Sequence, residues 1–302
     1  MRVLTVLCAA AAVGLAAGGA AAPKVVAKIR TPFSPCAAAE AAGAVWVTSY
    51  AEGALVRIDR RTNKVTAQID VGRTPCGLAA GAGSLWVNGY GTNTVERVSP
   101  RTRKLVRRIA VGRSPYDVLF AAGSVWTTNN GSNTVSRISP RTNRVIKTIR
   151  IPGGPGGLGF SGGAVWVGTT ASANVYRIDP RTNAVTAVPL GGTRHVWLST
   201  SLRDVWVSNG LDGTVTRIDA TTNDVVATVK VGDLPVDGAV APDGLVWIPN
   251  KSDSTISIID PGRNAVTRTI RSGAGPFVVS VAFGDMWVPS YDGGDVWRYD
   301  LD

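Results

Sequence analysis

Seven Trp residues recur along this chain at intervals of 40 residues, with a single interval of 41: Trp46, Trp86, Trp126, Trp166, Trp206, Trp247 and Trp287. Each interval repeats the pattern seen between Val205 and Gly244, where the runs VWVSN, TVTRID and VVATVKV and the shorter run DGAVA are separated by Gly, Asn or Asp. Alternating apolar and polar residues within such runs indicate half-buried strands. Four short strands in a fixed period of about 40 residues predict a β-propeller.

Counting the repeats predicts seven four-stranded blades and an all-β fold. The predicted blades are Gly43–Ala82, Gly83–Ala122, Gly123–Gly162, Gly163–Leu202, Arg203–Asp243 and Gly244–Gly284. The final unit, Asp285–Asp302, ends after two strands. Val25–Arg30 matches the third strand of a repeat and the run from Ser34 matches the fourth, so we expect both to complete the seventh blade. Strands from both termini then close the ring and leave no open sheet edge along the circle.

The first 22 residues differ in composition from the repeats. Met1-Arg2 is followed by an apolar run, Val3–Ala17, and by the small residues Gly18–Ala22. This order is typical of a cleaved secretory signal peptide, and the apolar run is too short for a membrane span. We therefore expect residues 1–22 to be removed and residues 23–302 to form one domain. The mature protein is predicted to be secreted or to lie in the periplasm or cell envelope.

The run VWVTSYAEGALVRIDRRTNKVTAQIDVGRTPCGLA, which begins at Val45, resembles the YVTN-type propeller repeat, with Trp in place of its Tyr. The resemblance covers 25–302. It implies a seven-bladed propeller that acts outside the cytoplasm as a binding or scaffold module. More distantly, the chain is similar to the virginiamycin B (streptogramin) lyases, seven-bladed propellers that open cyclic antibiotics with magnesium. WD-repeat proteins match poorly, because the Trp-Asp dipeptide is absent.

The lyase resemblance does not extend to the active site. In that family a His follows the Pro that opens one strand of the repeat, and Glu residues bind the metal. Here the residues after those prolines are Cys36, Cys76, Tyr116, Gly156, Val236 and Phe277, and His195, the one histidine, replaces a Pro. The three glutamates, Glu40, Glu52 and Glu96, follow no Trp-Val-Thr run. We therefore predict no catalytic residue, metal or cofactor, and retain a lyase with a non-standard site as the alternative function.

Differences between equivalent repeat positions mark the candidate ligand site, because identical positions serve the scaffold. Blade four departs furthest, since LGGTRHVWLS replaces the usual Gly-x-x-Pro-x-Gly-Leu-Ala. Aromatic and hydrogen-bonding groups in the loops at this end are typical of a pocket. The predicted ligand-binding residues are Arg194, His195, Trp197, Tyr116, Asp117, Asp237, Tyr50, Tyr90, Asn130, Asn209, Lys251, Phe277 and Tyr291. Alternatively, His195 and Trp197 only plug the channel mouth.

The formal net charge of +11 favours anionic partners. One Arg recurs in the second run of six repeats, as Arg57, Arg97, Arg137, Arg177, Arg217 and Arg298, with Ile258 in the remaining repeat. These groups either bridge blades or form a ring that binds a polyanion. The expected partner is a small molecule or an anionic cell-envelope polymer. We expect no nucleic acid, because the aromatics are not interleaved with Lys and Arg, and we expect a monomer.

Cys36 and Cys76 occupy the same position in two neighbouring repeats. In an exported protein, two such cysteines favour a disulfide, provided that their Cα atoms lie within about 7 Å. The prediction places this bond between blades seven and one, where the chain ends meet. Two buried thiols that do not react are the alternative.

Overall fold

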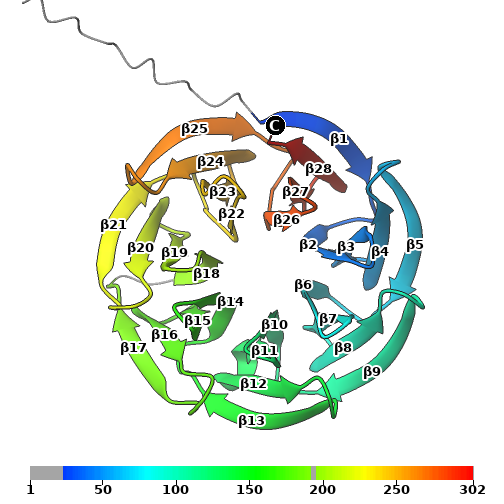
Figure 1. Ribbon diagram of the computed structural model, residues 1–302, viewed down its shortest axis with the longest axis horizontal. Helices are drawn as coiled ribbons and strands as arrows, with labels where there is room; N and C mark the ends of the chain where they lie inside the picture. Colours follow the sequence, from blue (N-terminus) through cyan, green and yellow to red (C-terminus); the bar gives the residue numbers. More distant parts are fainter. Residues whose placement is uncertain (1–22, 192–194, 302) are drawn as a thin grey trace, which may run out of the picture.

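The protein is a closed ring of seven antiparallel blades around a central channel, as Figure 1 shows in a computed structural model. The structure describes residues 23–191 and 195–301. Each blade has four strands, and the described residues contain a single short 3₁₀ helix, η1 (Asn130–Ser132). The predicted seven-bladed all-β propeller is therefore confirmed.

Each blade runs from an inner strand beside the channel to an outer strand at the rim (Figure 1). The first three blades consist of β2 (Pro35–Ala41), β3 (Ala44–Ser49), β4 (Ala54–Asp59) and β5 (Lys64–Asp70); β6 (Pro75–Gly81), β7 (Ser84–Gly89), β8 (Thr94–Ser99) and β9 (Lys104–Ala110); and β10 (Pro115–Ala121), β11 (Ser124–Asn129), β12 (Thr134–Ser139) and β13 (Arg144–Arg150).

Blades four to seven follow the same order. They consist of β14 (Pro155–Ser161), β15 (Ala164–Thr169), β16 (Asn174–Ile178) and β17 (Val185–Pro189); β18 (His195–Thr200), β19 (Asp204–Asn209), β20 (Thr214–Asp219) and β21 (Val225–Lys230); β22 (Ala239–Val240), β23 (Val246–Asn250), β24 (Thr255–Asp260) and β25 (Ala265–Arg271); and β26 (Ser280–Ala282), β27 (Asp285–Ser290), β28 (Asp295–Asp300) and β1 (Lys24–Arg30).

The blade boundaries predicted from the sequence are wrong by one strand. The run from Ser34 forms β2, which pairs with β3 and not with the seventh blade. The physical reason is the two-residue hairpin that joins β2 to β3, in which Ala42 and Gly43 have φ values of +48° and +76°. Positive φ at both central residues is the signature of a type I′ turn, which places consecutive strands side by side. Each inner strand therefore belongs to the blade that follows it, so Cys36 and Cys76 lie in blades one and two.

The ring closes in blade seven, where β1 from the N-terminal region pairs with β28 from the C-terminal region. Val25 lies opposite Tyr299 and Ile29 opposite Val296. One strand thus comes from the start of the described chain and three from its end (Figure 1). Pairing across the junction satisfies the backbone groups that an open edge would expose.

The seven repeated Trp side chains fill the space between blades, and each is fully buried. Five of them donate a hydrogen bond from the indole N–H to the carbonyl at the end of their own inner strand, as Trp46 does to Ala41 at 3.2 Å. Because a buried indole N–H needs an acceptor, the same position in each blade suits the same residue. These residues belong to the scaffold.

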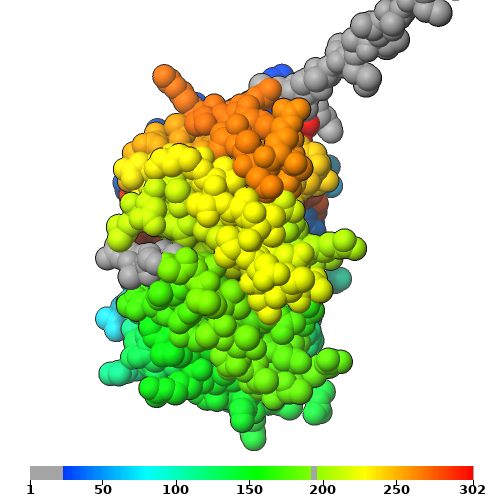
Figure 2. Space-filling view, turned by 90° about the vertical axis from the view of Figure 1, so that its left-hand side faces the viewer, coloured from blue at the N-terminus to red at the C-terminus, as the bar shows by residue number. Residues whose placement is uncertain are grey.

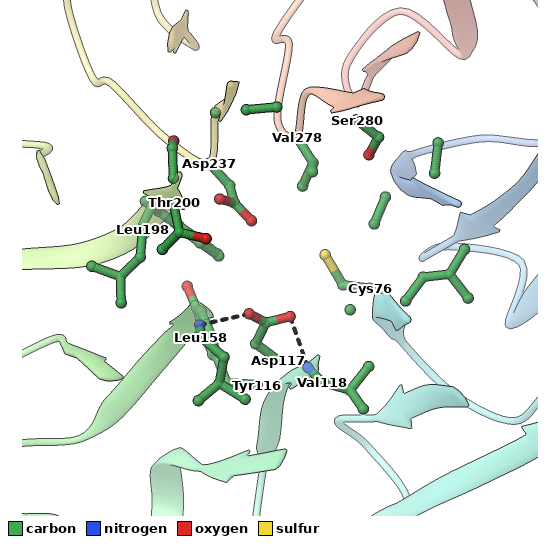
Figure 3. Close-up of a pocket in the computed structure, with 18 of the residues that line it drawn as sticks. Cys76, Tyr116, Asp117, Val118, Leu158, Leu198, Thr200, Asp237, Val278 and Ser280 are labelled. Atoms are coloured by element: carbon green, nitrogen blue, oxygen red, sulfur yellow. Dashed lines mark hydrogen bonds between the residues drawn. The ribbon is translucent and has the colours of Figure 1, made fainter. Parts of the chain in front are cut away.

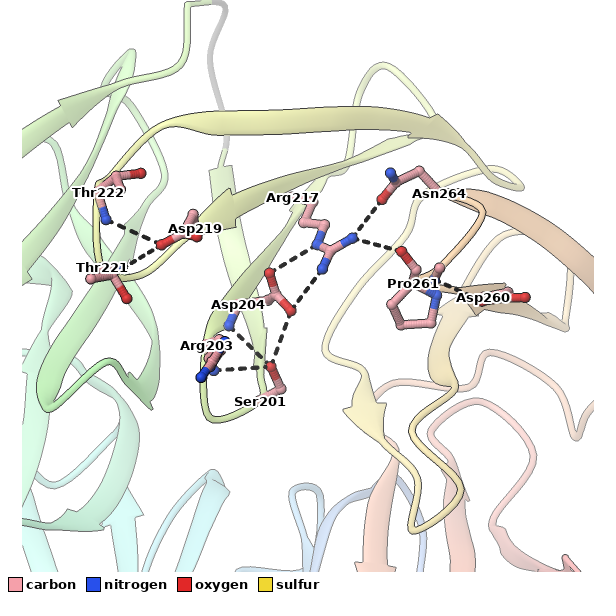
Figure 4. Close-up of polar contacts among 11 residues, drawn as sticks. Ser201, Arg203, Asp204, Arg217, Asp219, Thr221, Thr222, Asp260, Pro261 and Asn264 are labelled. Carbon is pink, nitrogen blue, oxygen red and sulfur yellow. Dashed lines mark hydrogen bonds and ion pairs between the residues drawn. The ribbon is translucent and has the colours of Figure 1, made fainter.

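Four of the repeated Arg side chains latch one blade to the next. In the example of Figure 4, Arg217 binds Asp204 in its own blade at 2.8 Å through Nε. Its Nη1 donates to the carbonyl of Pro261 at 2.7 Å and to Oδ1 of Asn264 at 2.8 Å, both in the following blade. Arg97, Arg137 and Arg298 make the equivalent contacts. We refer to these four as the arginine latches. Their guanidinium groups are engaged between blades, which favours the bridging alternative.

The exceptions among the repeated Arg positions have local causes. Ile258 precedes blade seven, where the chain ends replace the turn that a latch would reach. The turn equivalent to the one that a latch would reach from Arg57 carries Arg103 where the other turns carry Asn, and Arg57 binds Thr66 of its own blade instead at 2.6 Å. Arg177 has Ala164 where the latched blades have Ser or Asp, and its Nε has no partner.

Blades four and five are linked more closely than the others. His195 pairs with Asn209 of its own blade and also with Thr169 of β15, which merges the two sheets. In the remaining six blades, a Pro takes the place of His195 opposite the last residue of the second strand. Proline has no N–H to donate, whereas His has one. Figure 2 views the rim at blades four to six, which follow one another from green to orange.

None of the residues described here forms a helix long and apolar enough to cross a membrane.

Candidate functional site

Six aromatic side chains surround the mouth of the central channel, and we refer to them as the aromatic cup. In order round the mouth they are Tyr90, Tyr116, Trp197, Phe277, Tyr291 and Tyr50. Successive ring centroids lie 5.1–6.4 Å apart. Together with Asn88, Cys76 and Lys251, these rings enclose a depression of about 300 Å³. Rings at such separations attract one another and present both faces and edges to a ligand.

The cup forms because two kinds of segment meet at one end of the blades. Tyr50, Tyr90 and Tyr291 immediately follow the second strand of their blades, whereas Tyr116, Trp197 and Phe277 lie near the start of inner segments. The inner strands begin with a register shift, as between Pro115 and Val118. A bulge of this kind sends neighbouring side chains in the same direction. Consequently, the adjacent residues Tyr116 and Asp117 both line the channel.

Beneath the cup lies a cavity of about 290 Å³, which holds two carboxyl groups (Figure 3). Asp117 comes from β10, and Asp237 comes from the segment that leads into β22. Asp117 accepts backbone hydrogen bonds from Val118 at 2.7 Å and from Leu158 at 2.8 Å. Among the described residues, no donor bonds to the Asp237 carboxylate. The two side chains point into the same space in Figure 3.

The two acids of the cavity ionise less readily than ordinary carboxyl groups. Burial raises the pKa of Asp117 to about 6, although its two backbone hydrogen bonds act in the opposite direction. Burial also raises the pKa of Asp237 well above the usual value, and the nearby charge of Asp117 adds to this effect. The neighbouring phenol responds similarly, because burial and Asp117 raise the pKa of Tyr116. The pair thus carries less than two negative charges near neutral pH.

The structure brings together most of the predicted ligand-binding residues but not all of them. Tyr50, Tyr90, Tyr116, Trp197, Lys251, Phe277 and Tyr291 line the cup, and Asp117 and Asp237 line the cavity. Asn130 instead donates to the carbonyl of Pro155 at 3.3 Å, between blades. Asn209 is buried and donates to Thr214 and Thr216 within its blade. Arg194 and the side chain of His195 lie outside the described residues.

Lys251 is the one basic side chain at the cup among the described residues. Its Nζ lies 5.1 Å from the ring centroid of Tyr291 and 5.7 Å from that of Phe277. It also lies 3.9 Å from Asp292 Oδ2. The ammonium group therefore occupies the faces of two rings of the cup, as expected for a cation–π contact.

A disulfide joins Cys36 and Cys76 in the structure and forms part of the site wall, with Cα atoms 5.1 Å apart. Because both cysteines follow the Pro of an inner strand, the bond connects β2 to β6 across blades one and two. The location predicted from the sequence, between blades seven and one, is corrected by the strand pairing.

The sequence-based prediction did not include Asn88, which lines the cup. Its Nδ2 donates to the carbonyl of Pro115 in the next blade at 2.6 Å, and its Oδ1 accepts from the backbone N–H of Cys76 at 3.2 Å. Thr48, Thr128 and Ser208 stand at the same register and also donate to the next inner segment. A polar residue thus recurs two positions after the repeated Trp in these blades, and this pattern could have identified Asn88 from the sequence.

The prediction also omitted Gly77, which provides room for Asp117. A Cβ at Gly77 would lie 2.8 Å from Asp117 Oδ1 and 3.0 Å from Asn88 Oδ1. Among the described residues, no group of three or more His, Cys, Asp or Glu side chains is arranged to hold a metal ion.

Comparison with solved structures places the chain among seven-bladed propellers. A streptogramin B lyase structure is 14% identical, with a TM-score of 0.79 over 91% of this chain and 97% of that one. Virginiamycin B lyase from Staphylococcus aureus is 14% identical, with a TM-score of 0.79 over 93% of this chain and all of that one. The WD40 propeller domain of Doa1 is 11% identical, also with a TM-score of 0.79, over 93% of this chain and 97% of that one.

No protein-family model and no curated protein matches the chain. Structural identities of 11–14% establish the fold alone. The expected similarity to the virginiamycin B lyases is shown at this level. The Doa1 domain shares the same architecture, although this chain lacks the Trp-Asp dipeptide.

Proposed function

We propose that this protein is an exported binding protein that recognises a small molecule at the aromatic cup. The observation that carries the proposal is the convergence of six aromatic side chains from five blades above a polar cavity. The repeat explains buried rings between blades, but it does not explain rings that gather at a channel mouth. A concave site with aromatic walls and a few polar groups is the usual form of a small-molecule site.

Unlike the scaffold residues, the residues of the cup and cavity change from blade to blade at equivalent positions. The position after the Pro holds Cys76, Tyr116 and Phe277 in three blades. The inner strands of blades one to four have the same length and the same register shift whichever residue follows the Pro, so these differences are not needed for the strand pairing. They support a role in recognising a ligand that lacks seven-fold symmetry.

The proposal is tested by a thermal-shift screen of residues 23–302 with amines, amino acids, nucleosides, cell-wall fragments and cyclic depsipeptides. A ligand at 100 times its dissociation constant stabilises the folded state by about 2.7 kcal/mol. We expect Trp197→Ala and Phe277→Ala to abolish the shift. Phe33→Ala is the matched control, because Phe33 is 71% exposed and lies outside the cup. A ligand shift that survives both cup substitutions would refute the proposed site.

A second candidate function is binding of an anionic cell-envelope polymer at the rim of blades two and three. The outer strands and turns there carry exposed basic residues: Arg101, Arg103, Lys104, Arg107, Arg108, Arg141, Arg144, Lys147 and Arg150. None of them forms an ion pair with another of the described residues. A dense basic surface favours anionic polymers through its field.

This polymer binding is tested with dextran sulfate at two salt concentrations. We expect affinity to fall with salt, and we expect Arg107→Ser with Lys147→Ser to weaken binding further. Arg263→Ser with Arg271→Ser is the control, because it removes equal charge from blade six. Equal losses in the two double variants would assign the effect to net charge alone.

The lyase function remains the alternative that the sequence resemblance implies. Its support is the similar fold and a cavity whose two coupled acids have the pKa shifts that suit acid–base chemistry. The positions that would carry its His are occupied by Cys, Tyr, Gly, Val and Phe. Incubation with a cyclic depsipeptide and Mg²⁺, followed by mass spectrometry, tests it directly. A ring-opened product that disappears in Asp237→Asn would favour the enzyme over the binding protein.

A further inference from the structure

The cavity beneath the aromatic cup has acidic groups but no described basic group in its wall. Its lining includes Asp117 and Asp237, and the remaining described side chains are neutral. The other polar or sulfur-bearing residues of the wall include Tyr116 on β10, Cys76 of the disulfide on β6, Ser199 and Thr200 on β18, and Ser280 on β26. Lys251 lies higher, at the cup.

The two acids differ in how their charge is compensated. Two backbone N–H groups bind the Asp117 carboxylate. The Asp237 carboxylate has no such donor among the described residues, although it shares the cavity with Asp117 (Figure 3). An unpaired carboxyl group in a confined site either holds a proton or requires a cation. A cationic ligand would supply this missing partner.

The entrance to the cavity also suits a cation. Tyr116 and Trp197 line both the cup and the cavity, and the faces of aromatic rings attract ammonium groups. The structure contains an internal example, since Lys251 Nζ lies over both Tyr291 and Phe277. Aromatic walls above a carboxylate favour a ligand with an apolar body and a cationic end.

We propose that the site binds an organic cation, with its ammonium group between Asp117 and Asp237 and its apolar body within the cup. This inference rests on the proposed function, because it assigns a ligand class to the same site. A bare metal ion is less well suited, because the two acids are the only charged ligands that the described wall offers. An anionic ligand would meet two carboxyl groups.

Binding of the cation releases protons. In the empty cavity the acid pair retains a proton near neutral pH, because each carboxyl group raises the cost of ionising the other. An ammonium group between them stabilises the ionised form, and the displaced proton passes to the solvent. The ligand therefore binds more weakly as the pH falls from neutral, because more of the acid pair must then give up a proton before it can pair with the ammonium group.

The test uses isothermal titration of residues 23–302 with tryptamine and phenethylamine, each paired with the alcohol that replaces its ammonium group, tryptophol and 2-phenylethanol. We expect each amine to bind at least about tenfold more tightly than its alcohol at pH 7.5. Titrations at pH 6.5 in phosphate and in MES, which both buffer at this pH and differ in ionisation enthalpy, should show proton release with the amines only.

Asp237→Asn should weaken amine binding at least about tenfold and leave binding of the alcohols unchanged. Asp233→Asn is the matched control, because it makes the same change at an exposed acid in the preceding segment. Circular dichroism and the melting temperature of each variant establish that it folds. Asp117→Asn gives a second variant, in which one backbone N–H loses its acceptor.

The outcomes separate this inference from the proposed function. Equal binding of amines and alcohols, both lost in Trp197→Ala, would overturn the cation inference and leave the cup as a site for neutral molecules. Amine binding that persists in Asp237→Asn would also overturn it. Failure of both amines to bind below about 1 mM would overturn the inference, whereas the proposed function would still be decided by the screen of other ligands.

Discussion

The two ends of the blades differ in how far their side chains repeat from blade to blade. At one end, four arginine latches repeat the same contacts, from Nε to a Ser or Asp in the same blade and from Nη1 to a carbonyl and an Asn in the next. At the other end, equivalent positions hold different residues, including Tyr116, Trp197 and Asp237. Residues that repeat at equivalent positions therefore join neighbouring blades, and residues that differ from blade to blade form the candidate site.

The comparison also shows how the protein accommodates unfavourable groups. A latch encloses its guanidinium group with acceptors, and Asp204 contributes two bonds to Arg217. In the cavity, by contrast, Asp237 lacks a donor within the described chain. A stable fold tolerates such a group when binding or catalysis requires it, at some cost in stability. The substitutions below test this division, beginning with the largest expected effect.

Replacing both Cys36 and Cys76 by Ser should destabilise the protein by about 2–4 kcal/mol, because the bond closes a loop of 40 residues in the unfolded chain. Urea unfolding at pH 7 measures the change. Wild type in dithiothreitol is the control and should match the double variant. If the double variant is as stable as oxidised wild type, the covalent link contributes nothing to the wall of the site.

Arg217→Ala should cost about 2 kcal/mol, because it removes contacts to both blades and leaves Asp204, with 16% of its side chain exposed, without its cation. Arg57→Ala is the matched control, because the described residues give this side chain one hydrogen-bond partner, Thr66 of its own blade, and none in the next blade. It should cost less than about 0.5 kcal/mol. Equal losses in the two variants, measured by urea unfolding, would show that the interblade contacts add no stability.

Asp237→Asn should stabilise the protein at pH 7 and have almost no effect at pH 4. The folded pKa of Asp237 lies above the unfolded value, so the folded state binds more protons between these limits. Stability of the wild type therefore falls as the pH rises through this window, to which Asp117, with a pKa of about 6, also contributes. Urea unfolding at four pH values measures the difference.

Asp233→Asn is the control for this pH series. Asp233 is exposed, so the same substitution there removes one acid without touching the cavity, and the difference between the two variants is the quantity to follow with pH. If Asp237→Asn stabilises the protein equally at every pH, then ionisation of Asp237 does not destabilise the folded state.

The periodic features of the fold could be predicted from the sequence, whereas the pairing of each inner strand could not. The spacing of Trp46 and its six equivalents fixes the blade count, and Val25–Arg30 identifies the closing strand. A periodic pattern does not state where one unit ends, so the assignment of β2 required the hairpin at Ala42-Gly43. The positive φ of Ala42 has no sequence signature as strong as Asn-Gly.

The candidate site was partly predictable for a similar reason. Tyr116 and Asp117 stood out because they depart from the repeat. Asn209 differs little from the residues at the equivalent positions of the other repeats, and the structure places it in a buried hydrogen-bond network with Thr214 and Thr216. Side chains at neighbouring positions thus point in different directions, and for the inner strands this direction depends on the register shift near the start of the strand.

The smallest predicted effect completes the comparison by adding a latch where one is absent. Arg103 has a φ of +59°, while the equivalent residues at Asn63, Asn143 and Asn183 are better suited to left-handed backbone. Arg103→Asn should relieve this strain and offer Oδ1 to Arg57, which lies at the same spacing as Arg97 does from Asn143. We expect a gain of about 1 kcal/mol, measured by urea unfolding.

A double-mutant cycle separates the two causes of this gain. In the background of Arg57→Ala, Arg103→Asn retains the backbone contribution but cannot form the new hydrogen bond, so about half of the gain should remain. Arg101→Asn is the control for charge, because this exposed neighbour does not have a positive φ. If the full gain in the free energy of unfolding remains without Arg57, the gain comes from the backbone of the turn alone. An Arg would then stabilise the junction between two blades only where a Ser or Asp of its own blade also binds it.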